Sequence, residues 1–254
     1  MRTLLAILLF TLSANAQGIG GNAGIGGKAG IGGGFTVSAG ISFIASAQAC
    51  GLAAGGSGCN TVSGNSGPSS PTLNVLANDK IFVFCRANQG GVETVSDTAG
   101  DTFTYLAATV NDGFATSVRM AYIASPIANA SETFTCTNGS AQNANEVIVY
   151  QLRGGVNGAT LDANVQTTGS STNQLSGSFS TVVANEVIVW CTGNSNAPTY
   201  TVGAIGSGTG TNLVQTGFKG AGCEILIVTS TQSSITALMT STTTHFNGFL
   251  GSFE

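Results

Sequence analysis

Residues 144–149 read Ala-Asn-Glu-Val-Ile-Val, and the same six residues recur unchanged at 184–189. Residues 77–84, Ala-Asn-Asp-Lys-Ile-Phe-Val-Phe, are a looser third copy. In each copy a small polar turn and an acid precede a run of β-branched or aromatic residues, which is typical of a turn leading into a buried strand. The asparagine and the carboxylate are expected to cap the turn through hydrogen bonds from backbone N–H groups. The copies therefore predict strands in similar surroundings rather than catalytic roles for Glu146 and Glu186.

A similar sequence pattern extends from Thr72 to the C-terminus. Short runs of β-branched and aromatic residues alternate with turn residues and show almost no helical periodicity. This pattern predicts an all-β fold. Roughly ten to twelve strands over about 185 residues fit a single two-sheet antiparallel sandwich of the jelly-roll or Ig-like type. The expected strands are 81–85, 102–110, 118–122, 133–137, 146–152, 174–181, 186–191, 199–203, 212–218, 224–230, 235–240 and 246–253. The Asn-Asp-Gly step at 111–113 predicts a hairpin.

The N-terminal residues 1–16 have the features of a cleaved secretory signal peptide. Arg2 supplies a positive charge, residues 4–12 are apolar, and Ala-Asn-Ala at 14–16 is a cleavage site of the small-x-small kind. The apolar stretch is too short to cross a membrane, and no later stretch reaches roughly 18 apolar residues. We therefore expect a secreted, extracellular chain that begins at Gln17 and has no membrane span.

Residues 17–70 are rich in glycine and serine. Three six-residue units that each begin Gly-Ile-Gly-Gly occupy 18–35, and a Ser/Gly-rich stretch follows at 63–70. Such a composition predicts a flexible low-complexity segment and linker, so that the β-sandwich domain would span 71–254. The evenly spaced isoleucines also support another interpretation, in which this N-terminal segment packs against a neighbouring molecule and promotes self-association.

The charge content bears on one class of partner, nucleic acid. Only 7% of the residues are charged, against roughly 25% in an average soluble protein. With 7 Lys and Arg in total, a formal net charge of -4 and a pI near 4.8, the chain offers no basic patch that could neutralise a run of phosphates. Nucleic acid is therefore not an expected partner.

The six cysteines form an even set in a chain that is expected to be secreted, which predicts three disulfides. Several pairings are formally possible. We favour the sequential one, suited to neighbouring strands: Cys50 with Cys59, Cys85 with Cys136, and Cys191 with Cys223. No Cys-x-x-Cys pair is present and His245 is the only histidine, so a zinc site is not expected.

Candidate chemistry outside the cysteines is sparse. Asp97 and Asp101 flank a Thr-Ala-Gly turn and could together ligate Ca²⁺, although capping of the turn is the simpler interpretation and the one we favour. No Gly-x-Ser-x-Gly motif accompanies His245, so neither a catalytic set nor a cofactor is expected. Asn129 and Asn138 each begin a glycosylation sequon, which matters only in a host that glycosylates secreted proteins.

Several segments resemble a pattern found in uncharacterised secreted bacterial β-sandwich proteins. They are 95–104 (Val-Ser-Asp-Thr-Ala-Gly-Asp-Thr-Phe-Thr), 120–124 (Met-Ala-Tyr-Ile-Ala), 132–135 (Glu-Thr-Phe-Thr), the Gly-terminated strand 147–154 and the Leu-Asp step at 161–162. The resemblance covers roughly 72–254 and implies a β-sandwich fold but no activity. The six cysteines depart from the usual pattern and imply a more heavily cross-linked member.

Together these features predict a non-enzymatic extracellular protein with a role in adhesion, matrix or surface structure. The alternative is a carbohydrate-binding module with a glycan or surface polymer as its partner, and a third possibility is a hydrolase of unrecognised type. A conserved pair of acids facing one cleft would favour the hydrolase.

Overall fold

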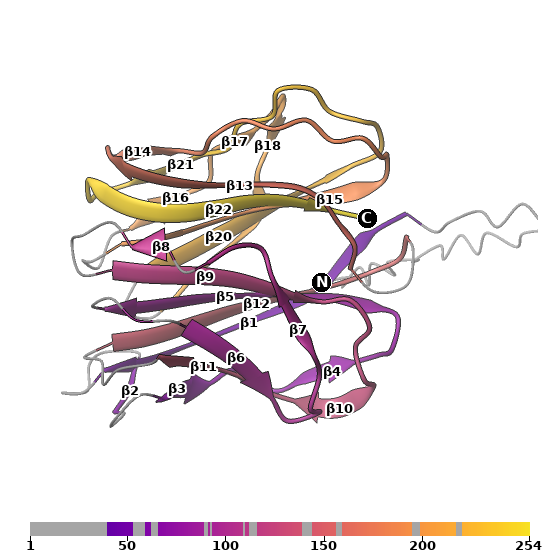
Figure 1. Ribbon diagram of the computed structural model, residues 1–254, viewed down its shortest axis with the longest axis vertical. Coiled ribbons are helices and arrows are strands. Elements are labelled where there is room, and N and C mark those ends of the chain that lie inside the picture. The colour runs from indigo at the N-terminus through magenta and orange to yellow at the C-terminus, as the bar shows by residue number, and fades with distance from the viewer. Residues whose placement is uncertain are drawn as a thin grey trace, which may run out of the picture. The chain divides into compact units, whose positions relative to one another are not determined.

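The computed structural model describes residues 40–254 apart from 53–58, 62–65, 89–90, 92, 109, 112–115, 139–143, 156–158, 195–198 and 217–219. The expected signal peptide and the Gly-rich units at 18–35 lie outside these residues. The described chain is all-β and contains no helix (Figure 1), as the sequence predicts. It accordingly has no apolar helix of the length needed to cross a membrane. The compact unit begins at Val37.

Strands β1 to β12 lie within residues 42–153. They are β1 (Ser42–Leu52), β2 (Asn60–Thr61), β3 (Ser66–Ser69), β4 (Leu73–Val75), β5 (Asp79–Asn88), β6 (Glu93–Asp97), β7 (Phe103–Tyr105), β8 (Val110–Asn111), β9 (Thr116–Ile123), β10 (Asn129–Glu132), β11 (Phe134–Asn138) and β12 (Ala144–Arg153). The main sheet has the order β2-β1-β12-β5-β9-β7, with β8 beside β9. Smaller sheets are β3-β11-β6 and β10-β4. All pairs are antiparallel except β1 with β2.

Strands β13 to β22 lie within residues 161–253. They are β13 (Leu161–Ser170), β14 (Asn173–Leu175), β15 (Glu186–Gly193), β16 (Tyr200–Thr201), β17 (Ala204–Ile205), β18 (Gly208–Thr209), β19 (Thr211–Gln215), β20 (Ala221–Val228), β21 (Leu238–Ser241) and β22 (His245–Phe253). The main sheet has the order β13-β22-β15-β20-β19. The smaller sheets are β14-β21-β16 and β17-β18.

The two groups of strands share one topology. Reading along the main sheets, β1, β12, β5, β9 and β7 correspond to β13, β22, β15, β20 and β19, and in the smaller sheets β3-β11-β6 corresponds to β14-β21-β16. Two serines make the same pair of contacts: the Ser70 N–H donates to the Phe134 carbonyl and its hydroxyl accepts from the Phe134 N–H, and Ser176 does the same with Ala237. The chain is therefore built from a first repeat, residues 42–153, and a second repeat, residues 161–253.

The main sheets of the two repeats pack face to face. Their shared core contains aromatic and aliphatic side chains of both repeats, among them Phe82, Tyr150, Val189, Phe249 and Phe253. Two further cores lie on the opposite faces, one under the small sheets of each repeat. Figure 1 shows these outer sheets on opposite sides of the stack, with β14, β21 and β16 at the top and β3, β11 and β6 at the bottom. The described residues thus form six sheets rather than the two expected from sequence.

Part of the segment 17–70, expected to be a linker, consists of strands of the domain. Strand β1 runs along β12 from the Ser42–Arg153 pair to the Leu52–Ala144 pair, and β3 pairs with β11. These strands belong to the first repeat, so the compact unit that contains both repeats begins at Val37 and not at residue 71. Between Ala45 and Gly51 strand β1 consists mostly of small residues, so it lacks the long apolar run that predicts β5, β12 and β15.

The cysteine pairing favoured from sequence is confirmed. Disulfides join Cys50 to Cys59, Cys85 to Cys136 and Cys191 to Cys223, which leaves no cysteine free. The second bridge connects β5 in a main sheet with β11 in a small sheet, whereas the third joins opposite residues of the neighbouring strands β15 and β20. Bridges of this kind stabilise a domain by roughly 2 to 4 kcal/mol each.

The buried acid Glu224 on β20 gives a pH-dependent contribution to stability. Its Oε2 accepts a hydrogen bond from the Gly203 N–H at 3.0 Å, and burial raises the pKa of this carboxyl from 4.5 to about 7. Because the folded state holds the proton more tightly than the unfolded state, the stabilisation is complete below pH 4.5 and is lost as the pH rises through 7.

We expect the Glu224→Gln variant to keep its stability as the pH rises through 7, because glutamine does not ionise. The variant should match the wild type in free energy of unfolding at pH 5 and exceed it by on the order of 2 kcal/mol at pH 8, after allowance for solvent screening. Urea denaturation at several pH values measures the difference. An equal pH dependence in both proteins would contradict this assignment.

Candidate metal centre

Three acidic side chains of the first repeat converge at one edge of its small sheets. Asp97 is the last residue of β6 and pairs with Phe134 of β11, while Glu132 is the last residue of β10 and pairs with Leu73. Asp101 follows the turn after β6. One carboxylate oxygen from each acid lies within 4.8 Å of those of the other two. The structure therefore joins the two acids that the sequence singles out to a third, Glu132.

Asp97 and Asp101 use one oxygen each to hold the local backbone. The Asp97 Oδ1 accepts hydrogen bonds from the N–H groups of Gly100 at 2.6 Å and Asp101 at 3.1 Å, so the turn capping expected from sequence is present. Gly100 has a φ of 82°, in the left-handed region that suits glycine. The Asp101 Oδ1 accepts from the Ile127 N–H at 2.8 Å. The Oδ2 atom of each aspartate is buried and has no hydrogen-bond partner among the described residues.

Glu132 is fully buried, and its carboxylate oxygens accept no hydrogen bond from any described N–H or hydroxyl group; the group it meets is the Asp101 carboxyl, with which it can share a proton. Burial raises its pKa to about 8, and the charges of Asp97 and Asp101 add to this effect. The ion pairs Arg86–Glu146 and Arg153–Asp79 involve other acids. The arrangement can therefore hold either a shared proton or a hard cation, since carboxylate oxygens are the ligands that such cations prefer.

The second repeat fills the corresponding positions with apolar side chains. Because Phe134 corresponds to Ala237, the Asp97–Phe134 pair corresponds to the Ile205–Ala237 bridge. The Glu132–Leu73 pair likewise corresponds to the bridge between Ile235 and Phe179. Ile205 and Ile235 are both buried in the apolar core of the second repeat. This edge of the fold can thus be built without any acid.

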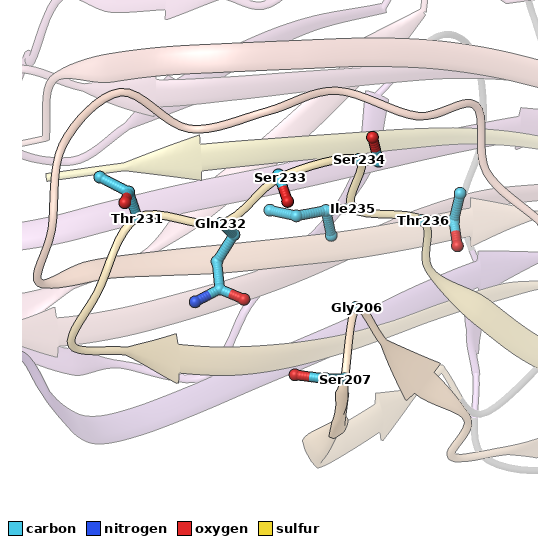
Figure 2. A pocket seen from close by; sticks show the side chains of 8 residues that line it. All are labelled: Gly206, Ser207, Thr231, Gln232, Ser233, Ser234, Ile235 and Thr236. Carbon is cyan, nitrogen blue, oxygen red and sulfur yellow. The ribbon is translucent and has the colours of Figure 1, made fainter.

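A pocket of about 440 Å³ lies at the same edge of the second repeat. Figure 2 shows the loop 231–236 beside the Gly206–Ser207 turn, which connects β17 with β18. Hydroxyl and amide groups dominate its lining, which consists of Gly206, Ser207, Thr231, Gln232, Ser233, Ser234, Ile235 and Thr236. Such a lining can hydrogen-bond an uncharged polar ligand. This pocket could not be predicted from the sequence, because these residues have the composition of an ordinary turn.

The remaining sequence candidates lie apart from these sites. His245 begins β22 and pairs with Ser170 of β13. Asn138 is buried, and its side-chain amide donates to Glu93 Oε1 at 3.3 Å, so this sequon is closed to glycosylation in the folded protein. Asn129 is half-buried at the start of β10, where its Oδ1 accepts from the Ser131 N–H at 3.0 Å.

Comparison with known proteins gave no match to a family model, to a curated protein or to a solved structure. The resemblance to secreted bacterial β-sandwich proteins therefore stays a prediction.

Proposed function

We propose that this chain is a secreted, non-enzymatic structural or adhesion protein of the cell surface or extracellular matrix, built on β-sandwiches of the jelly-roll or Ig-like type. The observation that carries the proposal is the character of its exposed strand residues. Outward-facing positions hold uncharged hydroxyl and amide side chains: Thr94 and Ser96 on β6, Thr104 on β7, and Asn164, Gln166, Thr168 and Ser170 on β13. Such faces suit contacts with other neutral surfaces.

The edge strand β13 supports assembly in particular. It is ten residues long, stands at the end of its sheet and pairs with β22. An edge of this kind presents N–H and C=O groups to any added strand, and natural proteins usually protect it with charges or proline. Within β13 the single charged residue is Asp162, near the start of the strand. The three disulfides fit an oxidising, extracellular location for such a surface.

We expect the N-terminal segment to contribute to this self-association. Its evenly spaced isoleucines offer apolar side chains to an edge such as β13 of another molecule. Light scattering over a wide concentration range should show assemblies for the chain that begins at Gln17 and a monomer for the chain that begins at Val37. Equal, monomeric masses for both chains would contradict the proposal.

The alternative function, carbohydrate binding, is favoured by one observation, the hydroxyl- and amide-lined pocket of the second repeat (Figure 2). A glycan array separates the two functions. Binding to a defined glycan that is lost in Gln232→Ala but kept in Gln166→Ala, a control on the exposed face of β13, would favour the carbohydrate-binding module.

A further inference from the structure

We propose that Asp97, Asp101 and Glu132 bind a hard divalent cation, with Ca²⁺ as the preferred ion, which ties the turn after β6 to the end of β10. The proposed function does not require this site.

The spacing of the oxygens fits one ion. Calcium–oxygen distances are about 2.3 to 2.6 Å, so two oxygens on the same ion can lie up to about 5 Å apart. The three carboxylate oxygens lie within 4.8 Å of one another, inside this limit. Calcium also accepts irregular sets of carboxylates and backbone carbonyls, whereas Mg²⁺ demands a near-octahedral arrangement and keeps several waters. A site formed by a turn and a strand end therefore favours calcium.

The buried carboxylate of Glu132 points to a ligand independently of the clustering. It is fully buried beside two other acids, and apart from a proton shared with Asp101 its oxygens have no donor within the described chain. Burying a carboxylate without hydrogen bonds or a counter-charge is strongly unfavourable. A cation bound by all three acids would remove this penalty, because it supplies the missing charge and occupies the unused oxygens.

The two aspartates are already oriented for such a role. In each, Oδ1 is fixed by backbone N–H groups, from Gly100 and Asp101 for Asp97 and from Ile127 for Asp101, while Oδ2 has no hydrogen-bond partner in the described structure. Fixing one oxygen reduces the freedom of the other, so less side-chain entropy is lost when an ion binds. Turn capping and metal binding are thus compatible in the same residues.

The second repeat provides an internal comparison. Ile205 and Ile235 occupy the positions of Asp97 and Glu132 and pack in its core. The shared fold therefore does not depend on acids at this edge, and their presence in the first repeat calls for a separate explanation. Cation binding supplies one, because it allows three neighbouring acids to ionise together and turns them into a cross-link between two segments.

The test uses the full mature chain, first treated with a chelator and then titrated with CaCl₂ or, separately, MgCl₂. Thermal unfolding and isothermal titration calorimetry report stability and binding. We expect Ca²⁺ to raise the melting temperature and Mg²⁺ to do so less. Glu132→Gln, which keeps the shape of the side chain, should weaken Ca²⁺ binding by about tenfold or more. Asp101→Asn should weaken it in the same direction.

Two further variants make the test decisive. Glu132→Ile copies the second repeat and should fold without any response to Ca²⁺, while Glu224→Gln, which neutralises a buried acid elsewhere, should keep the full response. If the wild type shows neither heat of binding nor a shift in melting temperature at millimolar Ca²⁺, the acids share a proton only and the proposal is wrong. An unchanged Ca²⁺ affinity in Glu132→Gln or Asp101→Asn would equally overturn it.

Discussion

Replacing Arg86 with methionine is expected to lower the free energy of unfolding by about 3 to 5 kcal/mol. Arg86 on β5 and Glu146 on β12 are both fully buried, with Arg86 Nη1 3.7 Å from Glu146 Oε1. Methionine replaces the stem of the arginine but not its charge, so Glu146 would be left as a buried carboxylate without its counter-ion. Urea denaturation followed by the fluorescence of the single tryptophan, Trp190, measures the loss.

The expected effect is large because this ion pair connects the two repeats. Arg86 Nη2 donates to the carbonyl of Asn194, and the hydroxyl of Thr216 donates to Glu146 Oε2 at 2.7 Å. Both partners belong to the second repeat. The backbone also comes close at Gly220, where an added Cβ would lie 2.6 Å from Glu146 Oε1 and 2.9 Å from Arg86 Cζ. Loss of the arginine therefore disturbs the packing of one main sheet against the other.

Two controls separate this mechanism from a general effect of losing an arginine. Arg119→Met removes a half-buried guanidinium that stacks 3.6 Å from the Tyr105 ring centroid and donates to the Glu93 carbonyl, and should cost only about 1 to 2 kcal/mol. The double variant Arg86→Met/Glu146→Leu should regain most of the lost stability, because no buried charge is left unpaired. A loss in Arg86→Met no greater than that in Arg119→Met would refute the connecting role.

The continuous apolar runs of the sequence correspond to strands that are buried on both faces. In β5, β12 and β15 nearly every residue is buried, since each lies in a main sheet between two cores. Continuous apolar runs are the expected signature of such strands. The prediction that the three sequence copies occupy similar surroundings is confirmed at this level.

The identical sequence copies do not lie at equivalent positions of the two structural repeats, so they do not reveal that the fold is duplicated. Residues 144–149 and 184–189 are identical, yet β12 corresponds to β22, and it is β5 that corresponds to β15. Both copies form a turn followed by a strand that is buried on both faces. This shared local environment accounts for the same six residues in two strands that are not equivalent in the two repeats. Turn capping also differs among the copies: Asp79 Oδ2 accepts from the Leu76 N–H at 2.8 Å as expected, whereas Glu146 pairs with Arg86 instead. For Glu146 the capping prediction was wrong.

The edge strand β13 and the contacts between residues far apart in the chain could not be predicted from local sequence patterns. Strand β13 alternates between exposed and half-buried residues and is mostly polar, so it lacks the apolar runs by which the other strands were recognised. Its ladder with β22 defines it, and that ladder joins residues far apart in the sequence. Glu132 was missed for the same reason. Asp97 and Asp101 are recognisable because they flank one turn, but only the pairing of β11 with β6 brings the third acid beside them.

A chain that begins at residue 71 is expected to lose the fold of the first repeat. It lacks β1, whose ladder with β12 spans ten pairs, from Ser42–Arg153 to Leu52–Ala144. It also lacks the Cys50–Cys59 disulfide and Ser70, which binds both backbone groups of Phe134. The bare edge of β12 and the apolar side chains beneath it would then favour aggregation. Circular dichroism and limited proteolysis should report loss of the resistant fragment that the mature chain yields.

The chain that begins at Val37 is the matched control, because it removes the Gly-rich units and keeps every described strand. At concentrations at which both chains are monomeric, its unfolding free energy should equal that of the mature chain, since every described strand is kept. The difference between the two truncations therefore measures residues 37–70 alone. Its size should exceed the few kcal/mol of one disulfide, because an entire strand of the main sheet is lost with it. Equal stability and equal protease resistance of the chains starting at 37 and 71 would show that β1 adds nothing to the first repeat, contrary to its place in the sheet.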